Sequence, residues 1–255
     1  MLSGIRLMAE IKRSESTGEK AKVPDLGDFG RSAHEMVGST IEDQLDQLRD
    51  KILLLGGSVE SAVERAIRSL TQRDTELANR VLADDNIIDQ MELEIDRLSV
   101  DILGSHRPTE HDLRLVVSVA KITPILERIA DHAASVAEAA TILNNEPQIS
   151  SYIDYSLMAE TAAGMLREAL DAFTSEDAEA SREIIRRDRK IDDCYHKVFG
   201  ELVQLMIRRP ETANGAARLL FVAKNLERIG DYVKDICELN VYLREAVFIK
   251  HSNQY

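Results

Sequence analysis

The sequence contains an internal repeat, which limits the possible fold more than any other feature of the chain. Four pairs of segments recur in the same order: TQRD at 71–74 with TSED at 174–177, DNIID at 85–89 with DRKID at 188–192, VAK at 119–121 with VAK at 222–224, and LERIAD at 126–131 with LERIGD at 226–231. The first three pairs are 103 residues apart, and the last is 100 apart because the first copy has three more residues, which include Pro124. Ordered matches of this kind indicate a duplicated structural unit.

Each copy has the apolar periodicity of α-helices, interrupted near Pro108, Pro147 and Pro210. With only 12 Gly and 5 Pro and no Trp, the composition also favours helices. We predict helices at about 35–71, 74–105, 109–144, 151–174, 177–208 and 211–248. A TxxD signal before the second helix of each copy predicts a threonine cap. Short loops make neighbouring helices antiparallel, so the predicted fold is all-α, with two tandem three-helix bundles related by internal duplication.

The predicted domain organisation has three parts. Residues 1–32 lack an apolar period and read as a flexible N-terminal extension. Residues 33–146 form the first three-helix bundle, and residues 147–250 form the second. Glycines at 56 and 57 and the proline at 124 are expected to bend the helices that contain them.

Charge and composition exclude several classes of protein. The chain has 45 Asp and Glu against 32 Lys and Arg, a net charge of −13, which argues against nucleic-acid binding. The longest uncharged stretch, 52–59, is far shorter than the roughly 20 residues that cross a bilayer. No secretion signal is evident, so we expect a cytoplasmic protein. Cys194 and Cys237 lack metal-site spacing and are expected to be reduced, buried thiols.

A row of acidic residues lies along the last predicted helix. Glu227, Asp231 and Asp235 recur every four residues. At roughly 100° per residue, this row points about 170° away from the apolar stripe of the same helix. We therefore expect the carboxylates to face solvent, and Glu127 and Asp131 to do so in the first copy.

Matching DxxxD pairs on the second helices would lie beside these rows. Clustered carboxylates repel one another unless cations neutralise them, and oxygen-rich clusters suit Mg²⁺, Mn²⁺ or iron. The sequence therefore suggests a metal site in each copy. The candidate ligands are Asp85, Asp89, Glu127 and Asp131 in the first copy and Asp188, Asp192, Glu227, Asp231 and Asp235 in the second.

Ordinary surface ion pairs are the alternative explanation of these acids. Arg128, Arg228 and Lys224 each lie three residues before one of them. A metal-free helical scaffold therefore stays open as an alternative. A ferritin-like di-metal enzyme is a weaker one, because it needs paired ExxH motifs facing the core and the chain offers only Asp193 with His196. We expect His132 to be a surface histidine and the chain not to be an enzyme.

The paired LERIxD motifs and the DxxxD segments before them resemble the PhoU family of phosphate-signalling regulators. The resemblance extends from about residue 33 to 249 and includes EDQLDQLRDKILLLGG at 42–57. It implies two three-helix bundles with multinuclear metal clusters at the acidic motifs, with iron, zinc, Mg²⁺ or Mn²⁺ as the metal. It implies the nine acids above as the ligands. Two departures are Ser135, where the second copy has Asp235, and Ala130 in place of a glycine; Ser135 predicts a weaker first site.

The resemblance also implies a function. A regulator of this family represses the phosphate-starvation response when phosphate is plentiful. Its expected partners are the ATPase subunit of a phosphate ABC transporter and a membrane sensor histidine kinase, and it is expected to be a homodimer. It would reach the membrane only through these partners, and it would relay a signal rather than catalyse a reaction.

Overall fold

The computed structural model describes residues 40–149 and 155–249, and these ranges contain α-helices and one short 3₁₀ helix but no strand. The elements are α3 (Ile41–Thr71), α4 (Thr75–Ser105), α5 (Glu110–Leu143), α6 (Tyr155–Ser175), α7 (Ala178–Arg208), η2 (Pro210–Thr212) and α8 (Ala213–Glu245). The predicted all-α fold is confirmed. The predicted extension 1–32 lies outside the described residues, so the domain boundaries stay predictions.

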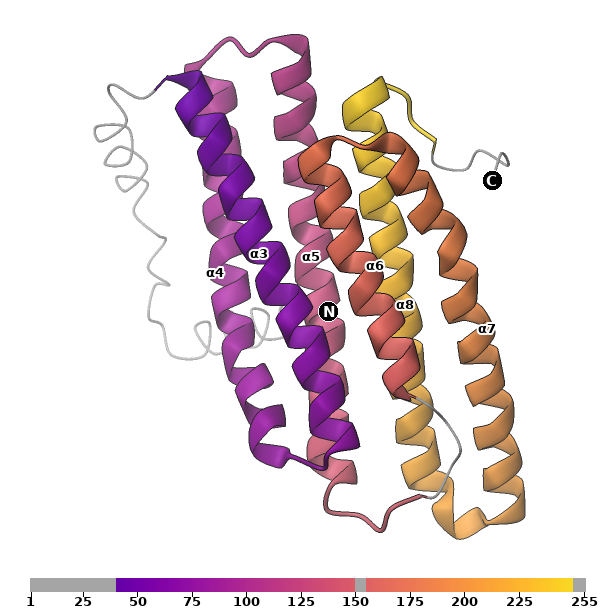
Figure 1. Ribbon diagram of the computed structural model, residues 1–255. Helices are drawn as coiled ribbons and strands as arrows, with labels where there is room; N and C mark the ends of the chain where they lie inside the picture. Colours follow the sequence, from indigo (N-terminus) through magenta and orange to yellow (C-terminus); the bar gives the residue numbers. More distant parts are fainter. Residues whose placement is uncertain (1–39, 150–154, 250–255) are drawn as a thin grey trace, which may run out of the picture. The chain divides into compact units, whose positions relative to one another are not determined.

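The helices form two bundles within one compact unit that begins at Ile41. Helices α3, α4 and α5 pack against one another, and α6, α7 and α8 do the same. The bundles meet through α5 against α8 and α3 against α6, which are matching helices of the two copies (Figure 1). The two copies of the sequence repeat therefore fold into two equivalent bundles that contact each other through matching helices.

Matching residues of the two copies meet where α5 contacts α8. The rings of His132 and Tyr232, which occupy the same repeat position, stack with their centroids 5.5 Å apart. His132 Nδ1 lies 2.7 Å from Asn225 Oδ1. This histidine is half-buried between the bundles, so it is not the simple surface residue that we expected.

The apolar stripes of the third helices form the centre of each bundle, as predicted. On α8, the side chains of Val222, Leu226 and Ile229 are fully buried, and Leu126 and Ile129 are fully buried at the equivalent positions on α5. Burying each such side chain contributes roughly 1.5–3 kcal/mol. The stripes therefore fix which faces of α5 and α8 are left for the acidic rows.

The turn before the second helix of each bundle differs from the prediction in its capping residue. The carboxylate of Asp74 accepts from Leu77 N, and that of Asp177 accepts from the amides of residues 179 and 180. Thr71 instead donates to the carbonyl of Ile67 in its own helix. The aspartate, and not the threonine, is the cap because it directly precedes the helix. The residue before each aspartate has positive φ, which ends the preceding helix and turns the chain there.

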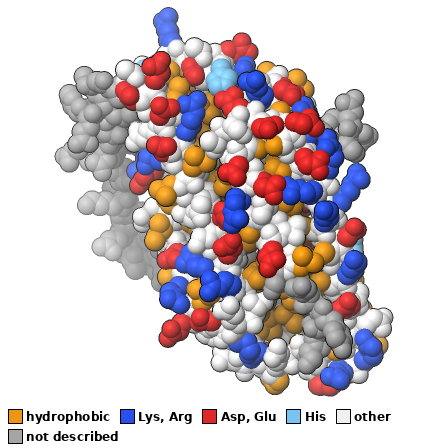
Figure 2. Space-filling view, viewed as in Figure 1, with side chains coloured by type: hydrophobic (Ala, Val, Ile, Leu, Met, Phe, Trp, Pro, Cys, Tyr) orange, Lys and Arg blue, Asp and Glu red, His pale blue; other side chains and the backbone are white. Residues whose placement is uncertain are grey.

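Two further sequence predictions concern the thiols and the membrane. Cys194 and Cys237 are both free, and only Cys237 is fully buried. None of the helices in the described part of the chain is long and apolar enough to cross a bilayer. Figure 2 shows acidic and basic side chains interspersed on one face, which therefore lacks a continuous basic surface for nucleic acid.

The two adjacent glycines of α3 have different surroundings, and α3 continues through both. A methyl group on Gly56 would lie 2.5 Å from Leu170 Cδ1 of α6, whereas one on Gly57 would meet nothing within 4 Å. Gly56 therefore allows close packing between the bundles, and the bend that we expected from these glycines does not interrupt the helix.

We predict opposite effects for alanine at these two positions. Gly57→Ala should raise the free energy of unfolding by about 1 kcal/mol, because alanine is the better helix former. Gly56→Ala should lower it by about 1 kcal/mol, because overpacking against buried Leu170 outweighs the same gain. Urea denaturation of both variants measures the difference. Equal stabilisation by the two alanines would show that α3 and α6 do not approach closely at Gly56.

Candidate metal centre

The first acidic cluster lies between α4 and α5. It consists of Asp85, Asp89 and Glu92 on α4 and Glu127 and Asp131 on α5. These side chains are close enough for their charges to act on one another, because neighbouring acids of the cluster contribute to the raised pKa values of Asp85, Asp89, Glu92 and Glu127. The side chains of Asp85, Glu92 and Glu127 are half-buried, and those of Asp89 and Asp131 are exposed. The cluster is therefore partly shielded from water.

Burial and mutual repulsion raise the pKa values of several carboxyl groups in the first cluster. Burial, followed by the charges of Asp131 and Asp89, raises the pKa of Asp85 to about 6. Burial, followed by the charges of Asp131 and Glu92 among others, raises the pKa of Glu127 to about 7. Burial is also the largest cause of the raised pKa values of Asp89 and Glu92. A cation at this position would relieve both the repulsion and the cost of burial.

Glu92 belongs to the cluster although it was not among the predicted ligands, and its spacing on α4 is a signal that could have identified it. Glu92 follows Asp89 by three residues and Asp85 by seven, so all three lie on one side of α4. The second copy has Tyr195 at the matching position, and a search limited to acids present in both copies therefore overlooks it.

Among the described residues, no cationic side chain forms an ion pair with the first cluster. Within residues 40–149 and 155–249, none of its carboxylates forms an ion pair or a side-chain hydrogen bond. The nearest base in sequence, Arg128, lowers the pKa of Glu92 only as the smallest of several effects. The surface ion pairs that could have explained these acids are therefore not formed in the first copy.

The second acidic cluster lies between α7 and α8 and contains its own cations. It consists of the equivalent acids Asp188, Asp192, Glu227 and Asp231. Lys234 Nζ lies 2.8 Å from Asp188 Oδ2 and 3.0 Å from Asp231 Oδ1. Three residues before the acids of α8, Arg228 donates to Asp231 over 3.1 Å and Lys224 donates to Glu227 over 2.6 Å.

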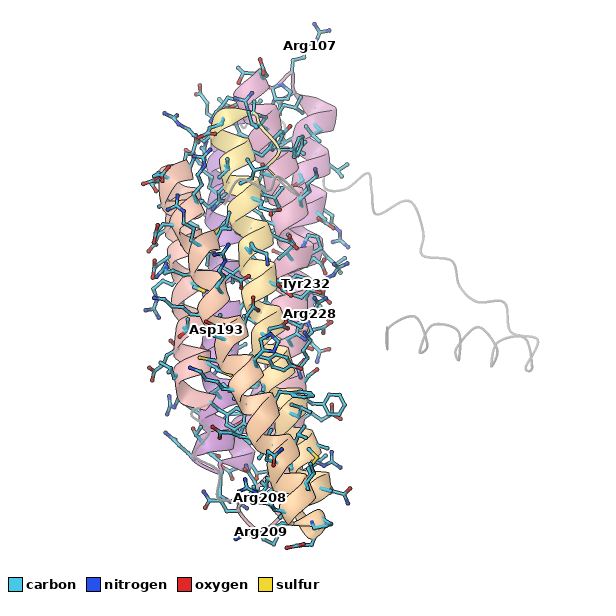
Figure 3. The ribbon with its side chains drawn as sticks, turned by 90° about the vertical axis from the view of Figure 1, so that its right-hand side faces the viewer. Arg107, Asp193, Arg208, Arg209, Arg228 and Tyr232 are labelled. Carbon is cyan, nitrogen blue, oxygen red and sulfur yellow. The ribbon has the colours of Figure 1, made fainter. Side chains whose placement is uncertain are left out.

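Arg228 and Tyr232 lie close together on α8 (Figure 3). The guanidinium carbon of Arg228 is 5.5 Å from the centroid of the Tyr232 ring. The ring therefore helps to hold Arg228 beside Asp231, and this part of the second cluster is the surface ion pair that the alternative explanation anticipated.

Asp188 is more deeply buried than expected for an acid beside a solvent-facing row of carboxylates. Its side chain is only 7% exposed, because α7 and α8 pack closely there. A methyl group on Gly230 would lie 3.0 Å from Asp188 Oδ1, so this close packing depends on glycine. The first copy has Ala130 at that position, and the matching Asp85 is only half-buried.

Asp235 lies apart from the second cluster. It lines a small hollow with Lys121 and Ile125 of α5 and with Phe248. Lys121 Nζ is 5.3 Å from the centroid of the Phe248 ring. The structure therefore brings together eight of the nine predicted ligands in two groups and places the ninth on the side of α8 that faces α5.

The two clusters differ in how well they suit a metal ion. Among the described residues, no three acidic, histidine or cysteine side chains already have the spacing of a metal site. The first cluster offers the oxygen donors that a hard cation requires, and within residues 40–149 and 155–249 no base forms an ion pair with them, so its donor set suits a metal ion. The second cluster does not fit in the same way, because Lys234 bonds to two of its would-be ligands.

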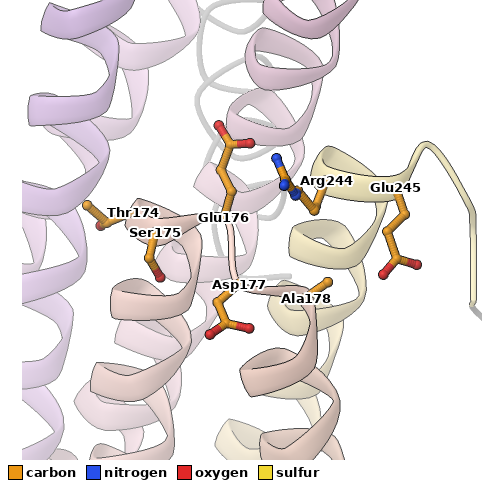
Figure 4. A pocket seen from close by; sticks show the side chains of 7 residues that line it. All are labelled: Thr174, Ser175, Glu176, Asp177, Ala178, Arg244 and Glu245. Carbon is orange, nitrogen blue, oxygen red and sulfur yellow. The ribbon is translucent and has the colours of Figure 1, made fainter.

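A further surface hollow shares no lining residue with either acidic cluster. It lies where the turn between α6 and α7 meets the end of α8, and Glu176, Asp177 and Arg244 line it (Figure 4). Asp177 already caps α7 with its carboxylate. The hollow contains none of the predicted ligands, so it is not the candidate site.

Comparison with known proteins finds the same repeat. The family model described as "PhoU domain" matches the chain twice, at residues 52–140 and 155–239. The curated phosphate-specific transport system accessory protein PhoU homolog of Pseudomonas putida is 34% identical over 209 residues, which are 82% of this chain and 82% of that protein.

Solved structures agree with this match. The crystal structure of PhoU from Pseudomonas aeruginosa has a TM-score of 0.79 and 34% identity, and the match covers 82% of this chain and all of that one. The phosphate transport system regulatory protein PhoU from Streptococcus pneumoniae has a TM-score of 0.77 and 29% identity, with coverage of 82% and 99%.

The raised pKa of Glu127 predicts how stability depends on pH. A carboxyl whose pKa is higher in the folded state stabilises folding below its ordinary value of 4.5, and this contribution is lost as the pH rises towards 7. In chelator at pH 8, Glu127→Gln should therefore raise the free energy of unfolding by about 1 kcal/mol, after allowing for solvent screening. The gain should shrink towards pH 5. Urea denaturation at both pH values checks it, and a gain independent of pH would show that ionisation of Glu127 does not destabilise the fold.

Proposed function

The chain belongs to the PhoU family, and from this premise we propose that it is an accessory protein that regulates phosphate transport through a cation bound to its first bundle. The observation that carries the proposal is the first acidic cluster, five carboxylates from two helices without a neutralising base among the described residues. Relatives named as phosphate transport accessory and regulatory proteins support the regulatory role.

Glu127 and Asp131 of α5, with Asp85 and Asp89 of α4, would hold the cation. Oxygen-only donors suit Mg²⁺, Mn²⁺ or iron better than a metal that prefers sulfur, and zinc is the further candidate from the family resemblance. The bound ion would supply positive charge that lets α4 and α5 bring their acids together. Glu92 would stand beside these ligands and add to the negative field.

Cation binding would couple to regulation through the packing of α4 on α5. These helices contact each other along the first bundle, and α5 also contacts α8 of the second. A change in the α4–α5 contact can therefore alter the surface that a partner meets. The proposed partners are the cytoplasmic ATPase subunit of a phosphate ABC transporter and a sensor histidine kinase, with the protein acting as a dimer that represses the starvation response in high phosphate.

The double variant Glu127→Gln with Asp131→Asn tests this function. It should lose most of the Mn²⁺ that the wild-type protein retains, because two of the central donors can no longer carry charge. Cells that carry it should resemble a deletion strain, with raised alkaline phosphatase activity in high phosphate. Elemental analysis of protein purified without chelator or nickel resin gives the metal content.

The matched control is Glu138→Gln, which changes an exposed acid on the same helix outside the cluster. This variant should retain both the metal and repression. If the double variant loses metal but represses normally, the ion has no regulatory role. If deletion leaves alkaline phosphatase unchanged in high phosphate, the chain does not repress the phosphate response.

A further inference from the structure

We propose that Lys234 acts as a tethered cation that occupies the second acidic cluster, so that only the first bundle takes up metal. This inference rests on the proposed function, in which the carboxylate clusters of the fold attract cations. It goes further by making the two copies chemically different. One bundle would respond to a metal ion, and the other would be permanently neutralised by its own side chain.

The contacts of Lys234 place its ammonium group between the two helices. Its Nζ donates to Asp188 on α7 over 2.8 Å and to Asp231 on α8 over 3.0 Å. The same two positions, as Asp85 and Asp131, belong to the first cluster. Lys234 therefore joins a ligand from each helix, which is the role that a bridging cation would have.

The burial of the Asp188 side chain favours a cation that remains permanently beside it. This side chain is 7% exposed, and its second oxygen, Oδ1, has no hydrogen-bond partner among the described residues. A buried carboxylate that lost its partner would be strongly unfavourable. A lysine on the neighbouring helix is always present at high effective concentration, whereas a metal ion must be supplied from solution.

The repeat shows that this arrangement belongs to the second copy alone. The position of Lys234 corresponds to Ala134. Lys224 corresponds to Lys121, but the three-residue insertion of the first copy places Pro124, and not a base, three residues before Glu127. Neither Ala134 nor Pro124 can pair with a carboxylate. The first copy therefore lacks two of the three bases that contact the acids of the second copy.

The charges of the two clusters favour tighter metal binding by the first bundle than by the second. Ser135 had predicted the opposite, a weaker first site. Asp235, the acid that the first copy lacks, lines the hollow beside α5 rather than the α7–α8 cluster. Its absence from the first copy therefore removes nothing from the matching group of carboxylates. Lys234, in contrast, forms ion pairs with two of the four acids in the second cluster.

Metal content measured in full-length variants tests the proposal. Each protein is dialysed against Mn²⁺, passed through a desalting column and analysed for manganese per chain. Asp188→Asn in the wild-type background should leave the content unchanged. Lys234→Met, which keeps the length but removes the charge, should raise the content by about one ion per chain, and adding Asp188→Asn should remove that gain. Lys234→Arg retains a positive charge and should behave as wild type.

Thermal unfolding provides a second readout and checks folding. In chelator, Lys234→Met should melt at a lower temperature than wild type, because Asp188 loses its cation. Mn²⁺ should raise the melting temperature of Lys234→Met more than that of the Lys234→Met with Asp188→Asn double variant. The double variant should fold, because it removes both charges of the pair.

The outcomes separate this proposal from the proposed function. A fall in manganese for Asp188→Asn alone would overturn the role of Lys234 and leave the first site intact. No manganese in wild type, with a gain in Lys234→Met, would support the tethered cation and reject the first site. No gain in Lys234→Met would overturn the tethered cation whether or not the wild-type protein binds manganese.

Discussion

Repulsion between carboxylates on adjacent helices is the constraint on which the rest of the molecule depends. The second and third helices of each bundle must pack along their apolar stripes, and this packing brings their acidic rows together at the edge of the contact. Like charges placed this close oppose the hydrophobic gain unless a positive charge lies among them. Packing of the core thus brings together carboxylates whose repulsion a cation would reduce, and the two halves of the fold differ in whether a lysine side chain lies among them.

The duplication allows the two acidic clusters to be compared directly, because each position in one copy has an equivalent position in the other. In the second copy, Gly230 allows α7 to approach α8, Asp188 becomes buried, and Lys234 neutralises it. In the first copy, Ala130 replaces that glycine, Asp85 stays half-buried, and no base contacts the cluster among the described residues. The same backbone arrangement therefore carries an acidic cluster paired with a lysine in one half and, among the described residues, an acidic cluster without an ion pair in the other.

The sequence was sufficient for the architecture because the repeat and the apolar period are strong signals of helix number and direction. It was less informative about the site. Helical angles placed the acids of the third helices towards solvent and the DxxxD acids of the second helices beside them, but how deeply Asp188 is buried depends on how closely a neighbouring helix approaches. The contact between Lys234 and Asp188 joins residues 46 apart in the chain. Asp235 was assigned by spacing and lies elsewhere, whereas Glu92 was missed because it has no acidic counterpart in the second copy.

The most direct test of this difference between the bundles is anomalous diffraction at the manganese edge from crystals grown with Mn²⁺. We predict density between α4 and α5, within bonding distance of Glu127 and Asp131, and none beside Lys234. Density between α7 and α8 with Lys234 displaced, or none between α4 and α5, would contradict metal uptake by the first cluster alone.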